Sequence, residues 1–228
     1  MAFLTALGAQ TGQEKVVDIP SLTVTGTANE KVSPDVATVR IGAIAQGKTA
    51  KAAQDSVNTR VAEFIRKAKA MLGDKGEVET GNINLQPLFR QEPNQPRQEI
   101  IGYQASNTLN IQVFDFTLVG PVIDTAVESG LNNVEYVSFG LRDDSAARVQ
   151  ALRNAVKQAE QKARAMAEAA NVDLVGILDL QEGGARVMPV FRGGMEMAAA
   201  RAADTPVEPG SVTVSGEVTI RYQIRARR

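Results

Sequence analysis

The chain has no cysteine, no histidine and no tryptophan among its 228 residues. Without cysteine and histidine there is no thiol nucleophile, no Ser-His-Asp triad, no imidazole base, and no zinc or iron–sulfur site with the usual ligands. An enzyme of this composition would have to use carboxylates, Lys, Arg, Tyr or Ser alone. Disulfides are also excluded, which fits the cytosol, or an oxidising compartment entered by a protein that avoids thiols.

Net charge and aromatic content are both low. The formal net charge is −1 and aromatic residues make up 4% of the chain, so neither electrostatic attraction nor base stacking favours nucleic-acid binding. No apolar run approaches the roughly 20 residues of a membrane-spanning helix. A short apolar stretch over residues 3–9 has no basic residue before it. Residues 1–18 are therefore interpreted as a frayed terminus or as the remnant of a signal peptide.

Hydrophobic residues make up 43% of the chain, which is enough for a sizeable core. Alternating apolar residues predict strands, and apolar residues three and four apart predict helices. Seven strands are expected over residues 21–28, 35–46, 77–89, 99–114, 134–141, 173–181 and 211–226, and three helices over 49–72, 117–129 and 145–170. The expected fold class is α+β, with an antiparallel sheet of long strands packed against two long helices. Residues 35–114 and 134–226 share an order of elements, which leaves open a weak internal βαββ pseudo-repeat.

Each long helix carries an apolar stripe that predicts its buried face. The first stripe consists of Ala50, Ala53, Val57, Val61, Phe64, Ala68 and Met71. The second consists of Val149, Leu152, Val156, Ala159, Ala163, Met166 and Ala170. Gly73 is expected to end the first helix, and Asn171 the second in the left-handed conformation. Asp143 and Asp144 are expected to cap the start of the second helix.

Similar phrases of alternating valine and threonine or serine, ending in glycine, occur near both ends of the chain. Residues 22–26 read LTVTG and residues 211–216 read SVTVSG. In both, the glycine falls on the apolar face of the predicted strand. Glycine at such a position predicts a bulge or the close approach of another backbone segment.

Two carboxylate pairs are candidates for acid–base chemistry, Asp143 with Asp144 and Asp124 with Glu128. Adjacent acids such as Asp143 and Asp144 point in different directions on a helix, so they do not form a two-carboxylate site. Each acid also has a simpler role in helix capping or on a solvated face. We therefore assign no catalytic residue, no cofactor site and no metal site.

Residues 183–210 form a long connection for a compact domain, and such connections tend to be functional. Its large apolar side chains are Val187, Met188, Val190, Phe191, Met195 and Met197. In one interpretation the segment folds back over its own sheet. In a second, residues 185–203 form a subunit or partner interface. In a third, the three methionines bind Cu(I) or scavenge oxidant.

Distributed motifs along the chain resemble those of the SIMPL-domain family, which includes periplasmic immunogenic and oxidative-stress defence proteins of Gram-negative bacteria. They are LTVTG at 22–26, SPDVA at 33–37, ETGNINLQP at 79–87, GYQASNTLNIQV at 102–113, the helix at 155–174 and SVTVSGEV at 211–218. None of these motifs is a catalytic signature. Asn171 stands where the family pattern usually has glycine, a change that a helix end tolerates.

The resemblance implies a single α+β domain over residues 19–226, with an apolar insertion at 183–210, exported to the periplasm by a signal peptide. It also implies ring-like homo-oligomers in some members, an association with oxidative or envelope stress, and no established enzymatic activity. We therefore expect a non-enzymatic, oligomeric periplasmic protein that contributes to stress tolerance through assembly or binding. The alternative is a monomeric binding module whose apolar loop 185–203 holds a peptide or lipid.

Overall fold

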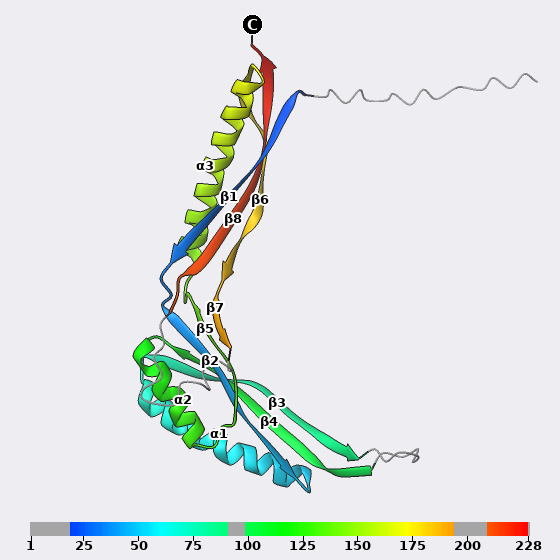
Figure 1. Cartoon of the computed structure of the whole chain (residues 1–228), viewed down its shortest axis with the longest axis vertical. Helices are drawn as coiled ribbons and strands as arrows, with labels where there is room; N and C mark the ends of the chain where they lie inside the picture. The colour runs from blue at the N-terminus through cyan, green and yellow to red at the C-terminus, as the bar shows by residue number, and fades with distance from the viewer. Residues whose placement is uncertain (1–18, 91–98, 194–208, 228) are drawn as a thin grey trace, which may run out of the picture.

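Two antiparallel sheets, each covered by its own helical layer, make up the fold (Figure 1). The computed structural model describes residues 19–90, 99–193 and 209–227. The three-stranded sheet contains, in spatial order, β1 (Ser21–Val32), β8 (Val212–Ala226) and β6 (Val172–Met188). The five-stranded sheet contains β3 (Gly76–Arg90), β4 (Glu99–Val113), β2 (Val36–Gly47), β5 (Asn133–Gly140) and β7 (Val190–Gly193). The α+β class is confirmed, with the antiparallel strands divided between two sheets.

The two sheets lie end to end, so the protein is elongated and bent (Figure 1). The chain passes from one sheet to the other through residues 33–35, between β1 and β2, and through Pro189, between β6 and β7. The helices are α1 (Ala50–Leu72), the short 3₁₀ helix η1 (Phe116–Leu118), α2 (Val119–Glu128) and α3 (Ser145–Ala169). Among the described residues, no helix is both long enough and apolar enough to span a membrane.

Helix α1 buries the face that its apolar stripe predicts. The buried side chains are Ala53, Val57, Val61, Phe64, Ala68 and Leu72, and they join the core of the five-stranded sheet. The helix begins where the Thr49 side chain accepts a hydrogen bond from the Ala52 amide, and ends at Gly73 with φ 53°. Local sequence signals are therefore sufficient to define this helix.

Helix α3 buries a face that overlaps the predicted one only in part: Ala159 and Ala163 of the predicted stripe are buried, but the centre of the buried face lies to one side of that stripe. Its buried residues are alanines four apart: Ala151, Ala155, Ala159, Ala163 and Ala167. Of the predicted stripe, Val149 and Met166 are 47% and 49% exposed, and Leu152 and Val156 are only partly buried. The prediction followed the larger side chains, but a close approach of the helix to the sheet favours the smallest ones.

Two glycines in the repeated phrases make that approach possible. A Cβ atom on Gly26 of β1 would lie 2.0 Å from the Ala155 carbonyl oxygen, and one on Gly216 of β8 would lie 2.7 Å from the Ala151 carbonyl carbon. Neither position has room for a side chain, because the α3 backbone occupies that space. The close backbone approach predicted from the two phrases is therefore confirmed, and α3 is the approaching segment.

The two sheets share one arrangement of three strands and a helix, but the second unit is built from other strands than the sequence pattern predicted. In the five-stranded sheet, β4 lies between β3 and β2, and α1 packs against these three strands. In the three-stranded sheet, β6 and β1 flank β8 under α3. The sequence pattern placed β5 in the second unit, as the counterpart of β2 in the first. In the structure, β5 pairs with β2 in the five-stranded sheet, and β1 pairs with β8 in its stead.

The long connection predicted over residues 183–210 is in part regular structure. Strand β6 continues to Met188 instead of ending near residue 181, and β7 pairs with β5 from Val190 to Gly193. Three register shifts interrupt β6 along its pairing with β8. Such bulges weaken the alternation of apolar residues, which explains why the sequence pattern predicted only part of the strand.

Candidate functional site

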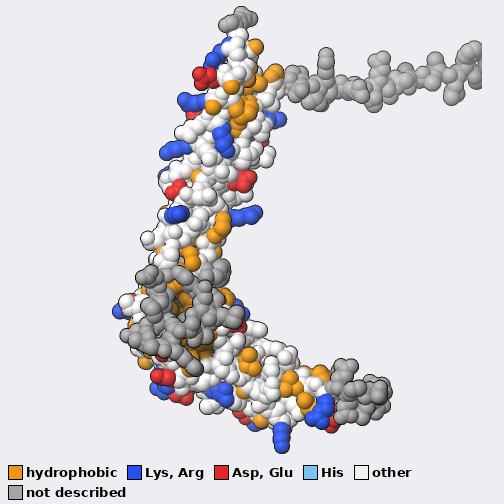
Figure 2. Space-filling model, in the orientation of Figure 1, with side chains coloured by type: hydrophobic (Ala, Val, Ile, Leu, Met, Phe, Trp, Pro, Cys, Tyr) orange, Lys and Arg blue, Asp and Glu red, His pale blue; other side chains and the backbone are white. Residues whose placement is uncertain are grey.

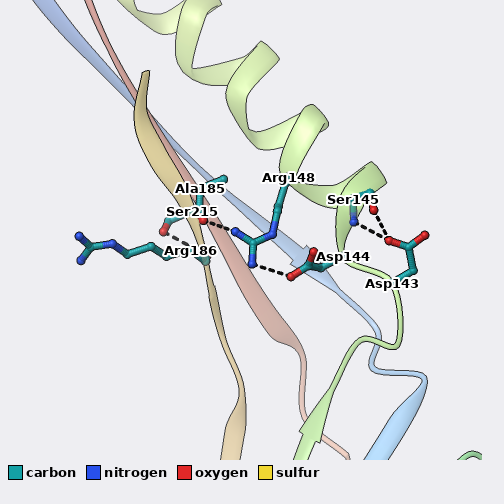
Figure 3. Close-up of polar contacts among 7 residues, drawn as sticks. All are labelled: Asp143, Asp144, Ser145, Arg148, Ala185, Arg186 and Ser215. Atoms are coloured by element: carbon teal, nitrogen blue, oxygen red, sulfur yellow. Dashed lines mark hydrogen bonds and ion pairs between the residues drawn. The ribbon is translucent and has the colours of Figure 1, made fainter. Parts of the chain in front are cut away.

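The two acidic residues before α3 each have a local partner (Figure 3). Asp143 Oδ1 accepts hydrogen bonds from the Ser145 amide, at 2.9 Å, and from the Ser145 hydroxyl. Asp144 Oδ2 lies 2.7 Å from Arg148 Nη2, and Arg148 Nη1 donates to the Ala185 carbonyl oxygen. Asp144 occupies the N-cap position but makes no capping hydrogen bond. The capping prediction is therefore correct for Asp143 and wrong for Asp144.

These contacts stabilise both carboxylates in their charged form. Hydrogen bonds from Ser145 lower the pKa of Asp143, and the hydrogen bond from Arg148 lowers the pKa of Asp144. The two carboxylates point toward different partners in Figure 3, so they do not share a proton. Asp144 instead holds Arg148, whose guanidinium connects the start of α3 to β6 at Ala185.

The second candidate pair, Asp124 and Glu128, lies exposed on α2. No hydrogen bond or ion pair joins either acid to another described residue. Within the described parts of the chain, no three acidic side chains gather closely enough to hold a metal ion. The arrangement therefore provides no convergent acid–base geometry at either predicted pair.

A groove of about 570 Å³ lies between α3 and β6. Its apolar lining comes from Ala167 of α3, Val172, Leu174, Val175 and Ile177 of β6, and Tyr222 of β8. A register shift between Leu174 and Gly176 interrupts the pairing of β6 with β8 here. Ile177 is left 56% exposed beside the helix. This volume is in the range of pockets that hold small molecules or anchoring side chains.

Charged side chains surround the groove, and its cations are already paired. Arg164 forms an ion pair with Glu160, and Arg227 Nε lies 2.8 Å from Asp173 Oδ1. Glu168 also lines the groove, and no described residue forms an ion pair with it. Burial raises the pKa of Tyr222, whose side chain closes one side. An apolar partner suits this groove better than an anion, because both arginines have carboxylate partners.

A second apolar surface lies on the β3–β4 hairpin. Its half-exposed side chains are Ile83, Leu85 and Phe89 on β3, and Ile100 and Ile101 on β4. In the sequence, these residues are ordinary positions of two predicted strands. Alternation predicts which side chains share a face of a strand. It does not show how much of that face a helix covers, so this surface was missed.

The predicted interface residues are only partly brought together. Val187 packs against the core beneath α3, and Val190 packs against the core of the five-stranded sheet. Met188 is 54% exposed. Phe191 lies in β7 with its backbone paired to Ser138, whereas Met195 and Met197 lie outside the described residues. The placement of Val187 and Val190 agrees with folding over the chain's own sheets, and the interface over residues 185–203 stays a prediction.

The model of one protein family, described as "SIMPL: Protein of unknown function (DUF541)", matches residues 22–222. The chain belongs to the SIMPL family. This match includes residues of both sheets, both long helices and the lining of the α3–β6 groove except Arg227. The resemblance drawn from the distributed motifs is therefore confirmed.

Curated relatives agree with this assignment. The "26 kDa periplasmic immunogenic protein" of Brucella melitensis is 28% identical over 211 residues, covering 90% of this chain and 84% of that protein. Its counterpart in Brucella abortus is 27% identical over the same length. The "Uncharacterized protein YggE" of Escherichia coli K12 is 28% identical over 150 residues, covering 64% of this chain and 60% of that protein.

Proposed function

We propose that this SIMPL chain is a non-enzymatic periplasmic protein that assembles into a homo-oligomer and contributes to tolerance of oxidative or envelope stress. Periplasmic location is supported by the printed name of the Brucella relatives, which align along most of this chain. A protein free of cysteine avoids unwanted disulfides in that oxidising compartment.

Assembly rests on one observation, the concentration of half-exposed large apolar side chains in two places. One group lies on the β3–β4 hairpin and the other along β6, where Val175, Ile177, Leu180 and Met188 are exposed. Single exposed apolar residues are normal, but contiguous groups on a monomer mark sites of interaction. Covering them would stabilise an oligomer through the hydrophobic effect.

A non-enzymatic role is supported by the residues that could have carried chemistry. Histidine and cysteine are absent from the whole chain. Asp143 and Asp144 serve in local hydrogen bonds and an ion pair at the start of α3. Protection against stress would then come from the assembled structure or from what it binds.

Light scattering on the purified full chain tests the assembly. We expect a mass several times the 24.3 kDa of one chain, independent of dilution over a micromolar range. A mass of one chain would overturn the proposal. Survival of a deletion strain under peroxide and envelope stress, with and without this gene, tests the physiological part. Equal survival would remove the stress role and leave assembly intact.

The second candidate function is that of a monomeric binding module for a peptide or lipid. The observation that favours it is the α3–β6 groove of about 570 Å³ with its apolar lining. The prediction from the sequence put such binding in the segment 185–203, whereas the groove lies at the start of β6. A monomeric mass together with saturable binding of an apolar fluorescent probe would support this candidate over assembly.

A further inference from the structure

Among the described residues, the β3–β4 hairpin continues beyond the other strands of its sheet as a two-stranded ribbon. The last residue of β2, Gly47, pairs with Tyr103, so no third strand continues beyond that point. We call the following residues the arm: Leu88–Arg90 of β3 and Glu99–Gly102 of β4. The register places Phe89 opposite Ile100, and both are 49% exposed. A two-stranded ribbon on its own is at best marginally stable in water, so a partner that covers this arm would stabilise it.

The arm carries enough apolar surface for a specific contact. Phe89, Ile100 and Ile101 belong to the arm, and Ile83 and Leu85 continue the exposed apolar surface along β3. With about half of each side chain exposed, these residues offer on the order of 400 Å² of apolar area, a size that marks interaction sites. A comparable area on a partner, with a polar rim, would approach the roughly 1,200 Å² of small specific interfaces.

The same chain carries a recessed apolar surface at its other end. The α3–β6 groove has Val175 and Ile177 half exposed in its lining, and Leu180 continues the apolar surface along β6. Figure 2 shows apolar side chains on the upper limb, formed by the three-stranded sheet, and on the hairpin at the far end of the lower limb. Because the molecule is elongated, an arm cannot reach the groove of its own chain (Figure 1).

Unpaired charges of opposite sign accompany the two surfaces. Arg90 is exposed on the arm, where the register places it opposite the exposed Glu99, and Glu168 lines the groove. Neither has an ion-pair partner among the described residues. A contact between arm and groove would bring these opposite charges together at the polar rim, where charge complementarity selects the partner and its register.

We propose that the arm of one copy inserts into the α3–β6 groove of a second copy. This inference rests on the proposed assembly and names the surfaces that form it. Arm and groove are different surfaces, so the contact is head-to-tail. Each copy then offers one free arm and one free groove, and repetition produces a closed ring or an open filament. The second copy is the occupant because it covers the arm and fills the groove in one contact.

The absence of cysteine allows a direct test by cross-linking. Ile100→Cys and Ile177→Cys are made as separate variants, co-expressed with different affinity tags, and treated with a short bis-maleimide. We expect a covalent dimer that carries both tags. Either variant expressed alone should give no dimer, because arm–arm and groove–groove contacts do not occur. Asp124→Cys on the exposed face of α2, paired with Ile177→Cys, is the matched control and should also give none.

Light scattering on the same wild-type preparation separates this inference from the proposed function. A multimeric mass without the mixed-tag dimer, or with a dimer of Ile100→Cys alone, would overturn the arm–groove contact and leave assembly standing. A monomeric mass would overturn both. A mixed-tag dimer equally strong with the Asp124→Cys control would show random collision and would also overturn the contact.

Discussion

Gly26 of β1 and Ala155 of α3 are in direct backbone contact, with no room for a side chain on the glycine. A Cβ atom at residue 26 would lie 2.0 Å from the Ala155 carbonyl oxygen and 2.7 Å from the Ala159 amide nitrogen. The alanine face of α3 therefore depends on this glycine, and the helix must move if the glycine is replaced.

We expect Gly26→Ala to lower the free energy of unfolding by about 1–3 kcal/mol, which is the usual penalty for overpacking a core. Gly176→Ala is the matched control, because a Cβ there meets no atom within 4 Å, and its effect should stay within about 0.5 kcal/mol. Urea unfolding followed by circular dichroism measures both. Equal midpoints for Gly26→Ala and the wild type would contradict the packing described here.

Met166→Ala should change the stability by no more than about 0.5 kcal/mol, because the side chain is exposed on α3. The apolar stripe in the sequence predicts instead that Met166 is buried, in which case its truncation would lower the free energy of unfolding by about 2–5 kcal/mol. Phe64→Ala on α1 is the positive control. Phe64 is fully buried, so its truncation should lower stability by about 3–5 kcal/mol. A large loss for Met166→Ala would show that α3 is rotated from the orientation found here.

Asp115 should make stability depend on pH in the acid range. Hydrogen bonds from Thr117 and then from Lys75 lower the pKa of its carboxyl from 3.8 to about 2. A carboxyl whose pKa is lower in the folded state stabilises the fold above its unfolded pKa, and this contribution is lost as pH falls from 3.8 through about 2. The wild type should therefore resist urea better than Asp115→Asn at pH 6, and the difference should shrink at pH 2.5.

Asp124→Asn serves as the control for this experiment, because Asp124 is exposed on α2. Its urea midpoint should follow that of the wild type at both pH values. A constant difference between wild type and Asp115→Asn across the range would mean that Asp115 acts through packing and not through its charge.

Reversing the charges at the arm and the groove tests the proposed contact independently of cross-linking. Arg90→Glu should weaken assembly, because it places two carboxylates together at the rim with Glu168. Glu168→Arg alone should weaken assembly similarly. The double variant, Arg90→Glu with Glu168→Arg, should recover most of the wild-type mass at high protein concentration. The expected effect of each single change is about 0.2–1 kcal/mol per contact, repeated at every subunit. Additive weakening in the double variant would argue against a pairing of these two residues.

A double substitution of Phe191 and Met195 tests the interface predicted over residues 185–203. Replacing both with Ser should lower the mass measured by light scattering, since burying such side chains in a contact contributes roughly 1.5–3 kcal/mol each. The α+β domain should stay folded by circular dichroism, because its cores lie on other elements. An unchanged mass would favour folding of the segment over its own sheets.

Much of the architecture could be predicted from local patterns. The ends of α1 at Thr49 and Gly73, the left-handed Asn171 and the alternation in β8 follow from short-range rules of capping and strand burial. The candidate groove could not be predicted in this way. Its lining joins α3, β6 and β8, and the shift at Leu174–Gly176 that exposes it depends on pairing with a distant strand.

The amino-acid sequence by itself determined the fold class of this protein, with its antiparallel strands and its two long helices. It also determined the two glycines that allow another backbone segment to approach the strands closely. These are local properties, because periodicity and conformational preference act over a few residues. The tertiary structure decided which face of α3 is buried, how the strands divide between two sheets, and that the arm extends beyond the other strands of its sheet. Those outcomes depend on which distant segments meet, and the free energy of such contacts comes from packing and burial that no single segment contains.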